Sequence, residues 1–136
     1  MIRKIPPETK TFHFYNANPK NRRTGDCVVR ALSLALEQSW EDTLTGLFQV
    51  ALKVKSVPNS DDTYPAYLKE QGWIQMKQPR KKDGKKYTVG EWVKANKDKT
   101  MVISMANHCV CAKGGKVWDI WDCTGKSVCK YWVKGE

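Results

Sequence analysis

The sequence predicts an α+β fold in which helices come first and an antiparallel sheet follows. Between residues 27 and 95, apolar residues recur at the three- and four-residue spacing of helix faces. From Thr100 onward the spacing changes to the alternation that is typical of strands. Gly114-Gly115 lies between two such runs and indicates a two-residue hairpin, because both central positions of a type I′ turn require a positive φ.

The N-terminal residues 1–26 are rich in Pro, Asn and Lys, and Phe12, Phe14 and Tyr15 alternate loosely within them. We expect these residues to form an extended arm that packs on the rest of the protein. A chain of 136 residues that is 40% hydrophobic fits one domain over 1–136, because two separate cores would each be close to the lower size limit.

The helices are justified by spacing and by capping residues. The run from Cys27 to Glu37 lacks Gly and Pro and carries apolar residues on one face. Capping-box pairs, which mark helix starts, predict a helix after Ser39 to about Lys55 and another from Thr88 to about Ala95. A third helix is predicted from about 62 to 71, because Gly72 follows as a residue that closes a helix end.

The strands are justified by alternation of apolar and polar residues after Thr100. The predicted strands are residues 101–105, 108–113, 116–121 and 128–133. If Gly114-Gly115 forms the two-residue turn, residues whose numbers add up to 229 face each other across the hairpin. Lys113 then faces Lys116, and His108 faces Trp121.

Composition restricts the classes of protein. No run of apolar residues is long enough for a signal peptide or a membrane span, so we expect a soluble, cytoplasmic protein without membrane contact. Five cysteines without an export signal favour reduced thiols. The net charge of +10 leaves two interpretations open: a solvated surface, or a surface that attracts nucleic acid or an acidic protein.

Cys27 is the candidate nucleophile. Gly25 and Asp26 place it in the first turn of the predicted helix, where unpaired backbone N–H groups favour the thiolate and can bind an oxyanion. The alternative is a small buried residue at a helix start, which is common for free cysteines.

His108 is the candidate base, because the other histidine, His13, lies in the polar arm. The hairpin register puts Asp119 on the same face as His108, one diagonal step away, within reach for orienting the ring. A bulge in the loop would instead bring Asp122 to that face. Asp119 is the preferred partner and Asp122 the alternative.

These residues resemble a known family. The chain has Asn21 six residues before Cys27, with Asp26 directly before the cysteine and a predicted helix after it. This pattern is similar to that of papain-like cysteine peptidases. It is most similar to that of bacteriocin-leader (double-glycine) peptidases and their small bacterial and phage relatives. Asp119-Ile120-Trp121 resembles the papain-type Asn-Ser-Trp, in which the tryptophan shields the orienting residue. The resemblance implies a papain-like fold, with the Cys on an N-terminal helix and the His and Asp on the C-terminal sheet.

A second likeness is to ovarian-tumour-type deubiquitinases, which also have a papain-like core. Their Gly-Asn-Cys-Leu-Phe-Arg-Ala-Ile-Ser segment is similar to residues 25–33 of this chain. Thr24 stands where that family usually has Asp, and Asn21 stands where the leader peptidases have Gln. In those peptidases the upstream amide helps to form the oxyanion hole, so the resemblance implies this role for Asn21, which also fits a turn-former in residues 21–25.

Residue chemistry and resemblance together predict a peptidase, isopeptidase or amidase that acts on a peptide or protein. Cys27 attacks the carbonyl, His108 transfers the proton and Asp119 orients the imidazole, and no cofactor is needed. Two rival interpretations remain. One is an inactive papain-like fold that binds nucleic acid or an acidic protein through its basic surface and aromatic residues. The other is a zinc site made of Cys109, Cys111, Cys123 and Cys129.

Overall fold

The helices form where the sequence supplies apolar faces and caps. In the computed structural model, which describes residues 4–136, there are four of them: α1 (Cys27–Leu36), α2 (Trp40–Val54), α3 (Tyr64–Glu70) and α4 (Val89–Ala95). Ser39 caps α2 by accepting a hydrogen bond from the Asp42 N–H, and Thr88 and Glu91 form the predicted capping box of α4. No helix within these residues is long and apolar enough to cross a bilayer.

The helix ends follow from residues in the left-handed region. Glu37 and Lys55 adopt φ values of 54° and 61°, so α1 and α2 each end at the residue before them. Gly72, with a φ of 84°, follows the end of α3 as predicted, and α3 begins at Tyr64, two residues after the predicted start. A positive φ costs little at glycine, which explains its place there.

Six strands build one mixed sheet within the described residues: β1 (Phe12–Phe14), β2 (Trp73–Met76), β3 (Met101–Met105), β4 (His108–Lys113), β5 (Lys116–Asp119) and β6 (Lys130–Lys134). Their order across the sheet is β1-β5-β4-β3-β6-β2. All neighbours are antiparallel except β1, which runs parallel to β5. The α+β class is therefore as predicted.

The β4–β5 hairpin has the predicted register. Lys113 faces Lys116 and Cys111 faces Trp118, and both turn glycines have a positive φ. β5 is shorter than predicted because it ends at Asp119, whose own carboxylate accepts the next backbone N–H, that of Ile120, at 2.7 Å. β6 is also shifted, because it begins at Lys130 and extends to Lys134.

Two edge strands were not predicted. β1 lies in the N-terminal arm, which is otherwise extended as expected, and it completes one edge of the sheet beside β5. β2 pairs with β6 at the other edge and buries Trp73 while its other three residues are exposed, so it lacks the alternation that identifies a half-buried strand.

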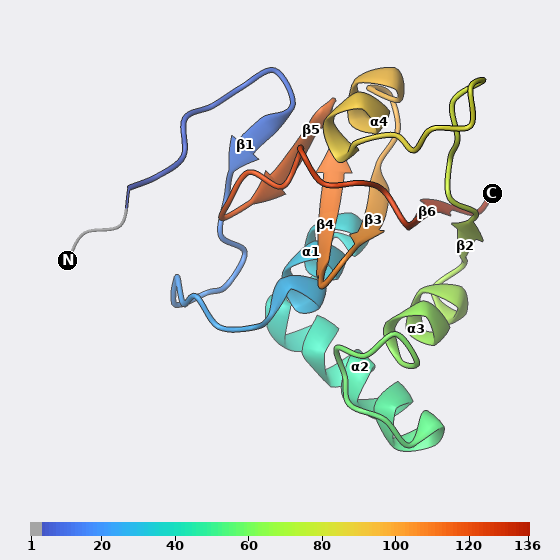
Figure 1. Cartoon of the computed structure of the whole chain (residues 1–136). Coiled ribbons are helices and arrows are strands. Elements are labelled where there is room, and N and C mark those ends of the chain that lie inside the picture. Colours follow the sequence, from blue (N-terminus) through green and yellow to red (C-terminus); the bar gives the residue numbers. More distant parts are fainter. Residues whose placement is uncertain (1–3) are drawn as a thin grey trace.

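The buried apolar residues form two clusters, and helices lie on both sides of the sheet (Figure 1). The helices α1, α2 and α3 lie toward one face, where α1 packs along β4 and Leu32, Cys109 and Trp132 are buried. Helix α4 and the segment after β5 cover the other face, where Phe12, Val93 and Ile103 are among the buried residues. This packing brings the start of α1 next to the start of β4, where the candidate site lies.

Candidate active site

Cys27 is the first residue of α1, and its side chain is half-buried at the helix start. The preceding Asp26 has no helical dihedral angles and makes no side-chain cap to the helix. Its carboxylate points instead into the protein, so the first-turn N–H groups beside Cys27 are not capped by it. Cys27 therefore has the helix-terminal position that the sequence predicted.

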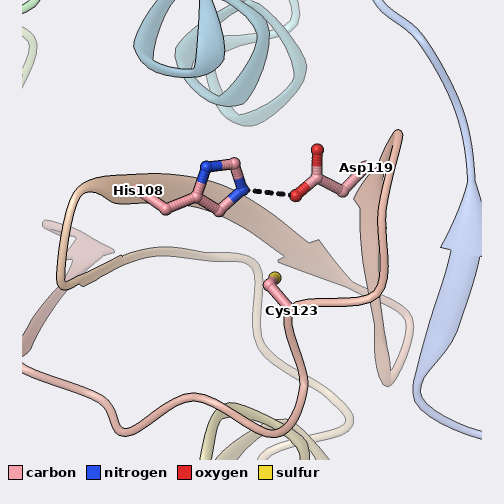
Figure 2. Close-up of side chains that lie close together, drawn as sticks. All are labelled: His108, Asp119 and Cys123. Carbon is pink, nitrogen blue, oxygen red and sulfur yellow. Dashed lines mark hydrogen bonds and ion pairs between the residues drawn. The ribbon is translucent and has the colours of Figure 1, made fainter.

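His108 is the first residue of β4, directly after Asn107, which turns the chain with a φ of 56°. Its ring is buried, with 6% of the side chain exposed, and the Trp121 ring covers it at a centroid distance of 4.6 Å. Nε2 of His108 lies 2.5 Å from Oδ2 of Asp119 (Figure 2). This contact leaves Nδ1 as the ring nitrogen for a second partner.

Asp119 is the last residue of β5 and is 1% exposed. Its Oδ1 accepts hydrogen bonds from Nη1 of Arg30 at 2.8 Å and from the Ile120 N–H, while Oδ2 serves His108. The alternative residue, Asp122, accepts instead from the backbone and hydroxyl of Thr124. The structure thus pairs His108 with Asp119, because the hairpin has a two-residue turn without a bulge.

One pocket of about 320 Å³ contains both Cys27 and His108. Three parts of the chain line it: the start of α1, the loop of residues 59–61 before α3, and the turn between β3 and β4. Asn21 does not line the pocket. It is exposed in the arm with a φ of 53°, and its N–H binds the Asn18 carbonyl, so it occupies a turn, which is the other role that the sequence left open.

The pKa values of the three residues favour a charged pair. Burial acts to raise the pKa of the Cys27 thiol, but His108 outweighs it and the pKa is lowered. Burial acts to lower the pKa of His108, but contacts with Asp119, Cys123 and Cys27 raise it to about 11. Burial likewise fails to raise the pKa of Asp119, because His108 and Arg30 stabilise the carboxylate. His108 and Asp119 are therefore an imidazolium and a carboxylate near neutral pH, and the lowered pKa of Cys27 shifts its thiol toward the thiolate.

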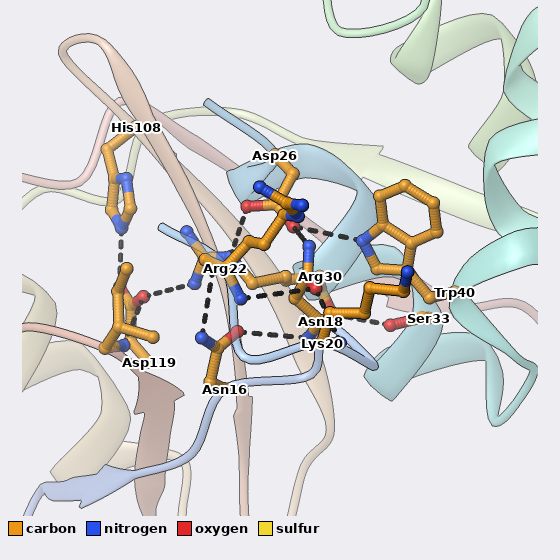
Figure 3. A network of polar contacts seen from close by, with 11 residues as sticks. Asn16, Asn18, Lys20, Arg22, Asp26, Arg30, Ser33, Trp40, His108 and Asp119 are labelled. Atoms are coloured by element: carbon orange, nitrogen blue, oxygen red, sulfur yellow. Dashed lines mark hydrogen bonds and ion pairs between the residues drawn. The ribbon is translucent and has the colours of Figure 1, made fainter. Parts of the chain in front are cut away.

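A buried network of hydrogen bonds connects Asp119 with helix α1, and it was not predicted from the sequence (Figure 3). Arg30 donates from Nη1 to Asp119 and from Nε to Asp26 at 2.9 Å, and its side chain is 8% exposed. Asp26 also accepts from Nδ2 of Asn18 and from Nε1 of Trp40, each at 3.0 Å. The signal in the sequence was an arginine four residues after an aspartate, inside a helix whose other residues are apolar except Ser33.

Cys123 lies against the pair formed by His108 and Asp119, and ligand atoms of the three residues lie within 4.8 Å of one another. Two ligands of one tetrahedral zinc ion are about 3.3 Å apart, given metal–ligand distances of about 2.0 Å. The 2.5 Å between Nε2 and Oδ2 is instead a direct hydrogen bond. Burial raises the pKa of the Cys123 thiol.

The four-cysteine zinc site is not assembled. Cys109 and Cys111 are buried on the helix side of the sheet, Cys123 is buried in the opposite cluster, and Cys129 is exposed. The sheet itself separates the first two thiols from the third.

The aromatic residues of the C-terminal half also form no continuous stacking surface. Trp132 is buried, Trp92 packs on Tyr131 at 5.2 Å, and Trp118 lies between His13 and Tyr15.

No family model, curated protein or solved structure matches this chain.

Proposed function

We propose that the protein is a cysteine-dependent amide hydrolase with a papain-like arrangement of Cys27, His108 and Asp119. One observation carries this proposal: a half-buried cysteine at a helix N-terminus shares a pocket with a histidine whose far nitrogen is bound to a buried aspartate. The pKa of the cysteine is lowered and that of the histidine raised, which is the state that a thiol nucleophile requires. The order of a nucleophile-bearing helix followed by a base-bearing hairpin also agrees with the papain-like resemblance.

The reaction follows from this arrangement. The Cys27 thiolate attacks the carbonyl carbon of an amide, and the C=O electrons move to oxygen, where the N–H groups of the first turn of α1 stabilise the oxyanion. The imidazolium of His108 gives its proton to the departing amine as the C–N bond breaks. Water then attacks the thioester, His108 takes its proton, and the C–S bond breaks to release a carboxylic acid.

The other residues of the site act on His108. Asp119 holds the ring through Nε2, which directs Nδ1 toward the thiol, and it stabilises the imidazolium. Trp121 covers the ring and limits the access of water to the hydrogen bond. We assign no step to Asn21, because it lies outside the pocket.

Hydrolysis of amides tests the proposal. The wild-type protein and Cys27→Ala are incubated with peptide, ubiquitin-type and cell-wall amide substrates, and products are measured by mass spectrometry. We expect cleavage in at least one class by the wild type alone, with a thioester adduct on Cys27 after acid quenching. Equal product from Cys27→Ala would contradict the proposal.

A second candidate is an inactive papain-like fold that binds nucleic acid or an acidic protein. It is favoured by a pocket of about 400 Å³ that Lys10, Lys94, Lys97 and Lys116 line together. Such a cluster neutralises phosphates, and its binding weakens as salt rises. This function predicts salt-sensitive retention of the wild type on single-stranded DNA or RNA. The Cys27→Ala variant should be retained in the same way, and the double variant Lys94→Glu with Lys97→Glu should not.

A further inference from the structure

One acidic residue, Asp61, lines the candidate pocket together with Cys27 and His108. It is exposed and lies in the loop between α2 and α3. Asp61 has no part in the reaction described above. Its place in the pocket therefore calls for a separate explanation.

Hydrogen bonds on both sides of Asp61 fix its position. The hydroxyl of Ser60 lies 2.7 Å from that of Ser56 and 3.2 Å from that of Thr63. The carbonyl of Ser60 accepts from the N–H groups of Thr63 and Tyr64, and the side chains of both are buried. Asp61 thus stands on a held turn, because the residues before and after it are tied to the protein.

The carboxylate of Asp61 is uncompensated, although the chain carries a net charge of +10. Among residues 4–136 no lysine or arginine lines this pocket, and Asp61 takes part in no ion pair there. The one cation of the lining, the His108 imidazolium, is paired with Asp119 and not with Asp61. The Tyr64 hydroxyl is a neutral neighbour, because burial and then nearby acidic groups, Asp61 among them, raise its pKa. An unpaired carboxylate at this place attracts a cation that enters the pocket.

The rest of the lining suits a long side chain with a charged end. Val28, Met105 and Tyr64, each at most 4% exposed, contribute a small apolar part of the lining, and Asn59 and Asn107 line the pocket as well. Lysine and arginine combine an apolar stem with a cationic head. The stem can therefore lie on Val28, Met105 and Tyr64 while the head reaches Asp61.

We propose that Asp61 is a specificity residue, and that the substrates carry a lysine or arginine side chain next to the scissile amide. This inference rests on the proposed hydrolase function, because it names the substrate class of that same pocket. An acidic side chain at the same place in a substrate is repelled.

Charged thiol reagents test the inference without a known substrate. Cys129→Ser is the background, because Cys27 is then the most accessible thiol and the other three cysteines are at most 3% exposed. Methanethiosulfonates with an ammonium, a neutral or a sulfonate head are reacted with Cys27, and rates are followed by intact mass. We expect Asp61→Asn to reduce the ratio of the ammonium rate to the sulfonate rate about tenfold, from the loss of one charge several ångströms away.

Asp62→Asn is the matched control, since its carboxylate is adjacent in sequence but does not line the pocket. It should leave the ratio unchanged. An unchanged ratio in Asp61→Asn would overturn the inference, and so would an equal loss with all three reagents, which would mean that Asp61 acts on the reactivity of Cys27. Slow reaction of the wild type with the neutral reagent would instead count against the hydrolase function.

Peptides give the second measurement. A library of acetylated peptides that contain Lys, Arg, Met or Glu at each position is digested with the wild type and with Asp61→Asn. We expect cleavage next to Lys or Arg in preference to the similarly sized Met, and loss of this preference in Asp61→Asn. Cleavage of Met and Glu peptides as fast as Lys peptides by the wild type would contradict the proposal.

Discussion

Asp119 is the residue that connects the candidate nucleophile with the interior of the protein. It accepts from Arg30 on one oxygen and lies 2.5 Å from His108 through the other, while it is 1% exposed. A carboxylate in such a place is stable only when its partners are present, because burial alone favours its neutral form. Its charge in turn maintains the imidazolium beside Cys27.

Replacement of Asp119 by Asn tests this dependence. The substitution removes a negative charge from His108, so the pKa of His108 should fall and that of Cys27 should rise. A higher pKa of Cys27 lowers the thiolate fraction at pH 7, by up to about tenfold for each unit of increase. We therefore expect a lower rate of Cys27 alkylation at pH 7 in Asp119→Asn than in the wild type.

Asp122→Asn is the control for this experiment. Asp122 lies three residues further along the chain and bonds Thr124 rather than His108. Its replacement should leave the alkylation rate unchanged. A larger loss in Asp122→Asn than in Asp119→Asn would show that the orienting carboxylate is assigned wrongly.

At the scale of elements, Arg30 joins helix α1 to strand β5 through Asp119 and to its own first turn through Asp26. Arg30→Met should lower the free energy of unfolding by about 3–5 kcal/mol, because it leaves two buried carboxylates without their partner. Lys53→Met is the comparison, since it breaks an exposed ion pair with Glu70 that contributes at most about 1 kcal/mol. Urea unfolding measures both, and equal effects would contradict the structural role given to Arg30.

The contact between α2 and α3 provides a second test at this scale. A Cβ added at Gly46 would lie 2.6 Å from the Tyr67 ring, whose hydroxyl accepts a hydrogen bond from Gln38. Alanine in a helix interior normally stabilises relative to glycine, by up to about 1 kcal/mol. Here we expect Gly46→Ala to destabilise by about 1–3 kcal/mol, because the ring has to move.

Gly125→Ala is the control, because a Cβ there meets nothing within 4 Å and the residue does not have a positive φ. Thermal unfolding followed by circular dichroism compares the two variants. An unchanged or higher Tm for Gly46→Ala would mean that α2 and α3 pack less closely than described.

Local sequence signals predicted most helices and strands, but they did not predict the strands that form by pairing with distant residues. Capping at Ser39 and Thr88 and the glycine pair after Lys113 act within a few residues, so the helices and the hairpin register follow from the sequence. The edge strands β1 and β2 depend on partners more than 50 residues away, and their own patterns are weak. The loop of residues 59–61, which contributes Asp61 to the pocket, could likewise not be placed from the sequence, because its position depends on how α3 packs against the rest of the protein.

At the scale of the whole molecule, the site exists because the sheet brings the two halves of the chain together. α1 comes from the helical half and packs on β4 from the other half, so Cys27 and His108 meet at one end of this contact. β1, from the N-terminal arm, lies beside β5, which carries Asp119. The central claim is that this arrangement lowers the pKa of Cys27 and so makes it an activated nucleophile.

The pH dependence of Cys27 alkylation by iodoacetamide tests that claim most directly. Measurements are made in Cys129→Ser, with and without His108→Ala. The folded pKa of Cys27 is lowered from its ordinary value of 9.0, so alkylation should persist as pH falls through 9.0 and decline only below the lowered pKa. In His108→Ala burial remains without the imidazolium, so the midpoint should move to 9.0 or above. If both proteins show the same profile with a midpoint at or above 9.0, Cys27 is not an activated nucleophile.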